Sequence, residues 1–163
     1  MNWPALLVSL LLGLCPFAWI VQRLWPNRYL GWGLDAGKGA MVVQLLKNQD
    51  EWVPWLALLL LIIGHVFTPF KELKKFSALP VFMGAVAVLS PEAGIASALV
   101  LAYATWVGKP AVIGTLSAVA AAAIAHWVFY STEIYFVVII PTFLLIAYQN
   151  EKEMDAILSP ESR

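Results

Sequence analysis

Two ionisable side chains, Asp35 and Lys38, stand three residues apart inside a largely apolar segment of this 163-residue chain. On a helix this spacing puts both side chains on one face, where the carboxylate and the ammonium can pair. Ionisable groups at membrane depth are costly, and they mark either a functional site or a structural ion pair. The residues alone leave both interpretations open, because side chains near a helix end can also extend to the membrane surface. Gly39 would allow the close approach of a ligand or of a neighbouring helix.

Histidine supplies a further candidate group. His65 follows Gly64 at the end of a long apolar segment, a few residues before a short basic loop. This position fits either a hydrogen-bonded structural side chain or a general acid or base. His126 has no motif around it, and we expect it to make a buried or interfacial polar contact.

The basic loop carries Lys71, Lys74 and Lys75. Lysines in such a connection set the orientation of a membrane protein and attract anionic lipid, contributing about 1 kcal/mol each near the surface. The same cations could instead bind a phosphate group.

Composition places the chain in a membrane. Hydrophobic residues make up 61% of it and charged residues 12%, whereas a soluble domain carries about 25% charged residues, and the mean hydropathy is +0.80. The single cysteine, Cys15, can form neither an internal disulfide nor a metal site. No phosphate-binding loop, dinucleotide fingerprint or metal-ligand spacing occurs. The basic residues are too few to indicate nucleic-acid binding, and we expect no cofactor.

Seven apolar segments predict the architecture. They run over about residues 4–24, 30–46, 52–67, 78–89, 93–107, 111–130 and 134–148. Stretches such as 56–63 and 118–125 are apolar on every face rather than alternating, which favours helices over a barrel. We expect Pro16 to kink the first segment and Ser90-Pro91 to separate the fourth from the fifth. The small residues of segment 111–130 predict a helix buried within the bundle. The fold class is therefore all-α: a polytopic transmembrane helix bundle of about seven spans, forming one domain over residues 1–163 with a short tail at 149–163.

Lysines and arginines predict the orientation. With seven spans, one side receives eight of them and the other receives Lys47 alone. The eight are Arg23, Arg28, Lys71, Lys74, Lys75, Lys109, Lys152 and Arg163. Because cytoplasmic connections carry the excess of basic residues, we expect the N-terminus outside and the C-terminus in the cytoplasm.

Three local elements, taken in order, resemble one family of small membrane enzymes. They are Leu12-Gly13-Leu14-Cys15-Pro16-Phe17, Asp35-Ala36-Gly37-Lys38-Gly39 and Gly64-His65. Together with the ungapped spacing from Gly64 to Pro91 and the predicted topology, they resemble the PlsY-type glycerol-3-phosphate acyltransferases of the bacterial inner membrane. Those enzymes acylate glycerol 3-phosphate from acyl phosphate.

The resemblance implies roles for particular residues. Asp35 and Lys38 would organise the catalytic site, and His65 would hydrogen-bond the substrate or act as a general acid or base. Lys74 aligns with the first lysine of the family's glycine-rich loop, so that Lys74, Lys75 and Gly39 would bind the substrate phosphate. The partners implied are membrane lipid, acyl phosphate and glycerol 3-phosphate.

The chain also departs from the family pattern. The family's Ser-Gly-Asn loop after the first span is absent, and its glycine-rich loop is replaced by Lys74-Lys75-Phe76-Ser77-Ala78-Leu79-Pro80-Val81, which has no glycine. Gln149-Asn150-Glu151-Lys152-Glu153 stands where the family has an Arg-His-x-x-Asn cluster. Two function classes follow: a divergent acyltransferase, or a non-catalytic lipid-binding or assembly subunit of a larger membrane complex. The missing donors favour loss of the parent activity, because each is worth about 2.7–4 kcal/mol in comparable sites.

Overall fold

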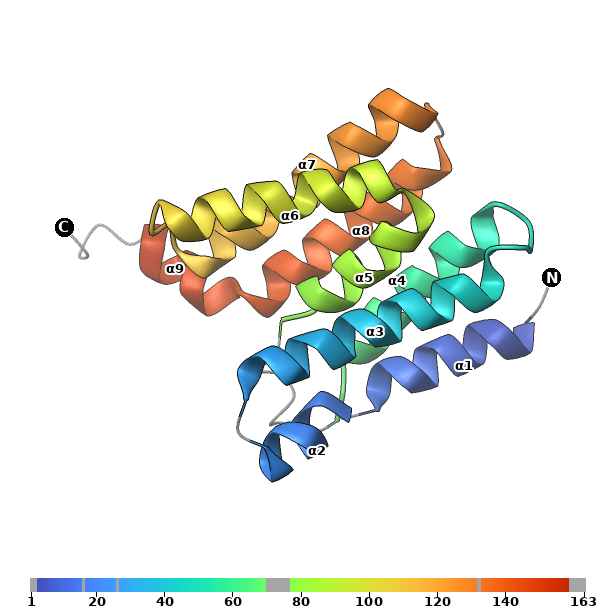
Figure 1. The fold of residues 1–163 in the computed structure, drawn as a ribbon, viewed down its shortest axis with the longest axis horizontal. Helices are drawn as coiled ribbons and strands as arrows, with labels where there is room; N and C mark the ends of the chain where they lie inside the picture. The colour runs from blue at the N-terminus through green and yellow to red at the C-terminus, as the bar shows by residue number, and fades with distance from the viewer. Residues whose placement is uncertain (1–2, 16, 26, 70–76, 132, 159–163) are drawn as a thin grey trace.

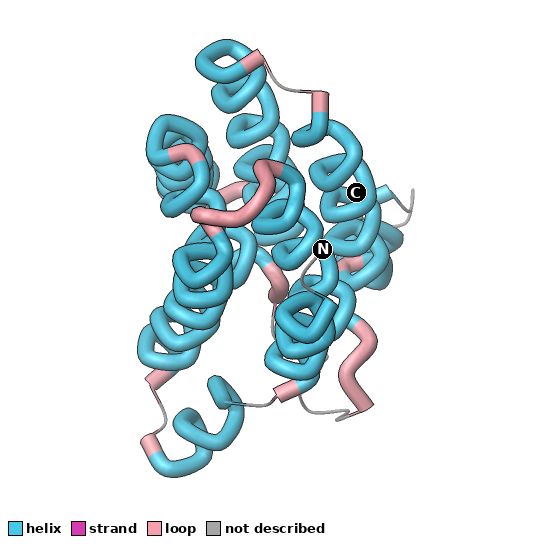
Figure 2. The backbone as a smooth tube through the Cα atoms, turned by 90° about the vertical axis from the view of Figure 1, so that its right-hand side faces the viewer, coloured by secondary structure: helices cyan, strands magenta, loops and turns pink. Residues whose placement is uncertain are grey.

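The computed structural model describes residues 3–15, 17–25, 27–69, 77–131 and 133–158. Within these ranges the chain forms nine helices and no strand, which confirms the all-α class. The helices are α1 (Trp3–Leu14), α2 (Phe17–Leu24), α3 (Arg28–Leu46), α4 (Trp52–Val66), α5 (Leu79–Leu89), α6 (Pro91–Trp106), α7 (Ala111–Tyr130), α8 (Ile134–Gln149) and α9 (Glu151–Leu158). Figure 2 shows helical backbone over most of the described chain.

The helix connections gather at two opposite ends of the bundle. Figure 1 shows the N-terminus at one end, with the α3–α4, α5–α6 and α7–α8 connections. The C-terminus lies at the other end, with the α2–α3, α6–α7 and α8–α9 connections. We call these the N-terminal end and the C-terminal end. Arg23, Lys109 and Lys152 belong to the C-terminal end and Lys47 to the other, so the described basic residues separate as the sequence predicted.

The helical path is interrupted at two places. The described residues of the first apolar segment form two helices, α1 and α2, with Cys15 outside both, and Pro16, which we expected to kink the segment, lies outside the described residues. Leu89 ends α5 and Pro91 begins α6, which confirms the predicted break. Ser90, the one residue between them, has φ −150° and ψ 88°, an extended conformation of the kind that a following proline imposes. It is fully buried.

The outer surface of the bundle is apolar. Helix α7, residues 111–130, is long and apolar enough to cross a membrane, as are α1 and the first part of α2 taken together up to Val21, and three shorter apolar helices accompany them. Large apolar side chains point outward from several helices, including Leu99 of α6 at 65% exposure and Val137 of α8 at 72%. Soluble monomers rarely expose apolar patches of this extent. These features are consistent with a membrane protein.

Helix α7 lies at the edge of the bundle, not inside it. Only 39% of its 18-residue apolar stretch is buried, and Ile124, Val128 and Phe129 are exposed. The expectation of a buried helix was therefore wrong. Its small residues bring one face close to α6, where Gly114 meets Ala104, while the opposite face stays open.

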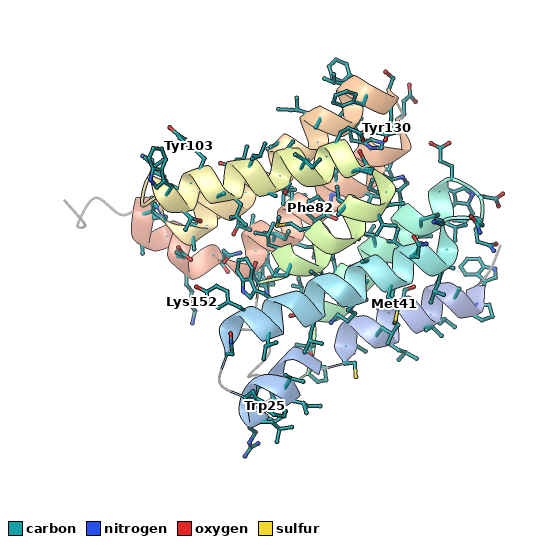
Figure 3. The ribbon with its side chains drawn as sticks, in the orientation of Figure 1. Trp25, Met41, Phe82, Tyr103, Tyr130 and Lys152 are labelled. Atoms are coloured by element: carbon teal, nitrogen blue, oxygen red, sulfur yellow. The ribbon has the colours of Figure 1, made fainter. Side chains whose placement is uncertain are left out.

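Glycines let two pairs of helices touch backbone to backbone. A methyl group added at Gly39 of α3 would clash with the carbonyl oxygen of Val81 of α5, and one added at Gly84 of α5 would clash with the carbonyl oxygen of Ala36. Gly13 of α1 and Gly64 of α4 stand in the same relation to each other's helices. The buried core lies against these contacts, and the fully buried Phe82 of α5 is near the centre of the bundle (Figure 3).

We predict that Gly39→Ala and Gly84→Ala each destabilise the protein by about 1–3 kcal/mol, because the added methyl group overpacks the α3–α5 contact. Gly37→Ala is the matched control, since nothing lies within 4 Å of its added methyl group. Helix propensity alone should make the control neutral or stabilising by up to about 1 kcal/mol. Thermal unfolding of the purified proteins in detergent measures the difference. Equal stability of all three variants would contradict the backbone contact.

Candidate functional site

Asp35 and Lys38 form a buried ion pair on α3. The Lys38 Nζ atom lies 3.4 Å from Asp35 Oδ1, and each side chain is 5% exposed. The two residues are one turn apart, so the helix itself brings them together, as their spacing predicted. Within the described chain Lys38 Nζ has this ion-pair partner but no hydrogen-bond partner.

Burial limits what this pair can do. Two charges removed from water lose hydration that their mutual attraction only partly restores, and removing one partner leaves an uncompensated charge. A water-soluble substrate cannot reach side chains that are 95% covered by protein without a rearrangement of the helices. In this structure each charge of the pair faces the other inside the bundle, and a role for Asp35 and Lys38 in catalysis stays a prediction.

His65 is also enclosed. It occupies the last turn of α4 and is 3% exposed. The preceding Gly64 packs against Gly13 of α1, and just beyond the helix the Thr68 hydroxyl donates a hydrogen bond to the Leu14 carbonyl oxygen at 3.5 Å. The Gly-His element therefore lies where α4 meets α1. The role of His65 in catalysis stays a prediction.

The predicted phosphate-binding residues divide into two groups. Lys74 and Lys75 lie outside the described residues. Gly39 lies at the backbone contact between α3 and α5, where Val81 and Ala85 fill the space beside its Cα atom. The close approach that its lack of a side chain permits is thus made by a neighbouring helix. A role for Gly39 in phosphate binding stays a prediction.

A large groove opens at the C-terminal end of the bundle. Its volume is about 1460 Å³, and helices α3 to α9 contribute to its walls. Apolar side chains such as Val66, Met83 and Leu101 line it together with Lys109 and Thr115. In Figure 3, Lys152, which also lines the groove, lies at the same end as Tyr103 and opposite to Tyr130. Asp35, Lys38, Gly39 and His65 are not among its lining residues.

The segment Gln149–Glu153 closes one side of this groove, and sequence analysis missed its role. The Gln149 Oε1 atom accepts a hydrogen bond from the Ala78 backbone N–H at 2.9 Å. The Glu153 Oε1 atom accepts one from the Val112 N–H at 3.3 Å. These N–H groups open α5 and α7, where backbone donors lack helical partners. The polar composition of the tail distinguishes it from the apolar helices before it. Nothing in the sequence of the tail, however, identifies the distant helices whose N–H groups it caps.

A polar and aromatic cluster occupies the N-terminal end of the bundle. The Tyr130 hydroxyl donates a hydrogen bond to Glu92 Oε2 at 2.8 Å. The His126 ring stacks on Tyr130 with 4.8 Å between ring centroids, and the Trp55 ring meets His126 edge-on at 5.0 Å. His126 is buried, which confirms the expectation of a buried or interfacial contact. The cluster joins α4, α6 and α7.

Comparison with known proteins decides the family. A family model described as glycerol-3-phosphate acyltransferase matches residues 29–159, well over half of the chain. The chain belongs to the glycerol-3-phosphate acyltransferase family. The resemblance to the PlsY-type enzymes is thereby confirmed. No curated protein and no solved structure matches the chain.

The extent of the match is informative in itself. It includes Asp35, Lys38 and His65 and both lysines of the predicted phosphate site. It begins at Tyr29, after α1 and α2. The family assignment therefore rests on the region from α3 onward, and the likeness of residues 12–17 to the family's first span contributes nothing to it.

The buried pair makes a quantitative prediction. Asp35→Leu or Lys38→Met alone should destabilise the protein by about 3–5 kcal/mol, because either change leaves one buried charge without its partner. The double variant removes both charges and should recover most of that loss. Thermal unfolding of all four proteins in the same detergent gives the coupling between the two positions. Additive effects of the two substitutions would show that the ion pair does not determine stability.

Proposed function

We propose that this family member does not acylate glycerol 3-phosphate and instead binds a membrane lipid or a related amphiphile in the groove at the C-terminal end. The proposal rests on one observation: the side chains that could carry out a reaction do not line the groove that a ligand could enter. Asp35 and Lys38 are paired with each other and buried, whereas the open groove is lined by other residues.

The start of α5 supports the loss of a phosphate site. In the family's pattern a glycine-rich loop occupies this region, and glycines let a backbone wrap a phosphate with its N–H groups. Here Ala78, Leu79 and Val81 are buried, and Pro80 has no N–H to donate. In the described part of this region, from Ser77 onward, Ala78 donates its N–H to Gln149, Leu79 donates its N–H to Ser77, and Pro80 has none to offer a phosphate.

The groove has the character of a site for an amphiphile. Small-molecule sites usually enclose about 300–1,000 Å³, and this groove, at about 1460 Å³, is larger. Val66, Met83 and Leu101 offer apolar contact for an acyl chain, and charged side chains of both signs line the groove for a headgroup: Lys109, Lys152, Glu151 and Glu153. A lipid with a zwitterionic headgroup matches this combination.

The proposal places the protein in a bacterial inner membrane. Membrane association is supported by the family and by the apolar helices. The excess of lysine and arginine at the C-terminal end supports a cytoplasmic position for that end and for the groove. The N-terminus would then lie outside. A role as a subunit of a larger membrane complex is compatible with this placement.

A divergent acyltransferase is the second candidate. The family membership favours it, as does the retention of Asp35, Lys38 and His65. For these side chains to reach acyl phosphate and glycerol 3-phosphate, the helices around α3 would have to open. Activity measurements separate the two candidates.

We predict that the purified protein makes no lysophosphatidic acid from acyl phosphate and glycerol 3-phosphate above background. It should also fail to rescue a bacterial strain that lacks its PlsY-type acyltransferase. The physical reason is the absence of a donor-rich phosphate site. An authentic PlsY-type enzyme, expressed to the same level, is the positive control. Turnover that disappears in Lys38→Ala or His65→Ala protein with unchanged thermal stability would establish the acyltransferase instead.

We predict that lipid purifies with the protein and that a bulky side chain in the groove removes it. Ala102→Trp fills the groove, which Ala102 lines. Ala120→Trp makes the same change at an exposed position of α7 outside the groove. Native mass spectrometry should show several-fold less bound lipid for the first variant and wild-type binding for the second. Equal occupancy in both variants would place the lipid on the outer surface rather than in the groove.

A further inference from the structure

Helix α9 is attached to the bundle by few contacts. None of its residues is buried. The chain turns at Asn150, whose backbone N–H donates to the carbonyl oxygens of Ile146 and Ala147 and whose Nδ2 atom donates to Ile146 at 2.7 Å. This turn fixes the direction in which α9 leaves α8 but not its position against the other helices.

Two side chains fasten the segment on opposite walls of the groove. Gln149 holds the start of α5, and Glu153 holds the start of α7, through the hydrogen bonds described above. The N-cap residues Ala78 and Pro110 make no side-chain cap, although at the start of α5 the Ser77 hydroxyl accepts a hydrogen bond from the Leu79 N–H at 3.2 Å. The segment adds one acceptor at each helix start, and in doing so it connects two helices that are far apart in the sequence.

The same segment forms part of the groove wall. Residues 148–153 all line it, as do Ser77 before α5 and Ala111, Gly114 and Thr115 of α7. The distance between the starts of α5 and α7, which Gln149 and Glu153 hold, therefore affects the width of the groove at this end. Figure 1 shows α9 beside the turn that joins α6 to α7.

The hydrogen bonds made by Gln149 and Glu153 differ in length and in the burial of the residue that makes them. The Gln149 bond, at 2.9 Å, comes from a partly buried residue that ends α8, a helix packed against α4 and α7. The Glu153 bond, at 3.3 Å, comes from an exposed residue of a helix with no buried side chain. When Glu153 leaves Val112, α9 can swing about Asn150 without disturbing the core.

We infer that Gln149–Glu153 is a strap over the groove, anchored at Gln149 and released at Glu153, and that its release controls ligand entry and exit. This inference rests on the proposed lipid-binding function. Release exposes the groove wall formed by α7, and an amphiphile can then enter from the C-terminal end of the bundle.

The test compares Glu153→Ala with Glu151→Ala, which removes the same charge from the same exposed helix, and with Glu153→Gln, which keeps an acceptor oxygen. Strap release is measured without any ligand, from hydrogen exchange of the α9 amides and of Val112. It is also measured from maleimide labelling of a Thr115→Cys side chain in a Cys15→Ser background. Loss of one hydrogen bond should raise these rates about threefold to tenfold in Glu153→Ala. Glu151→Ala should match the wild type, and Glu153→Gln should lie close to it.

Ligand exchange is measured separately, from the dissociation rate of a fluorescent lysophosphatidylethanolamine, whose headgroup is zwitterionic, in detergent micelles. That rate should rise in Glu153→Ala by the same factor as the labelling rate. Unchanged exchange and labelling in a Glu153→Ala protein with wild-type thermal stability would overturn the strap. Faster labelling with an unchanged dissociation rate would overturn its control of the ligand. Absence of lysophosphatidylethanolamine binding by the wild type would refute the proposed function and with it the gating role, while the labelling data would still decide whether the strap opens.

Discussion

The contact of α3 with α5, made backbone to backbone at Gly39 and Gly84, is the constraint on which the rest of the bundle depends. Two helices approach this closely only where side chains are absent, so the register between them is fixed within one turn. The contact places Asp35 and Lys38 in the interior, because they stand on α3 within four residues of Gly39. It also seats Phe82, the largest fully buried side chain, at the centre of the core. Helix packing, rather than contact with water, therefore determines where Asp35 and Lys38 lie.

This constraint separates two regions that an enzyme would combine. The charged pair lies in a tightly packed interior, and the space able to hold a ligand lies at the C-terminal end, where α5 and α7 begin. Helix starts offer N–H donors to anions, but here the protein's own Gln149 and Glu153 accept from two of them. In this family member, two backbone donors at helix starts are thus used within the protein. This arrangement suits retention of a hydrophobic ligand better than capture of a small, doubly charged one.

Local sequence predicted much of the fold, and distant contacts account for what it left out. Apolar length identified the helices, and the Ser90-Pro91 pair identified the α5–α6 break, because the effect of proline acts on adjacent residues. The spacing of Asp35 and Lys38 predicted their pairing for the same reason. In contrast, the sequence left open whether Gly39 would meet a ligand or a helix, where the structure places Val81 of α5, and it predicted a buried α7, which lies at the edge; both outcomes depend on which helices meet. The caps made by Gln149 and Glu153 bridge 71 and 41 residues of sequence, a separation that no local pattern encodes.

The single-residue link at Ser90 has a consequence for how such chains can vary in length. Each residue added to a helix turns everything beyond it by about 100° and advances it by about 1.5 Å. An insertion within α5 would rotate Gly84 away from Ala36 or change the direction of α6. Ser90 is the only residue between the two helices and is buried, so the connection cannot adjust to either change. The exposed connection at residues 47–51 carries no comparable restriction. Insertions and deletions in related chains should therefore collect there, leaving the α5–α6 corner constant in length.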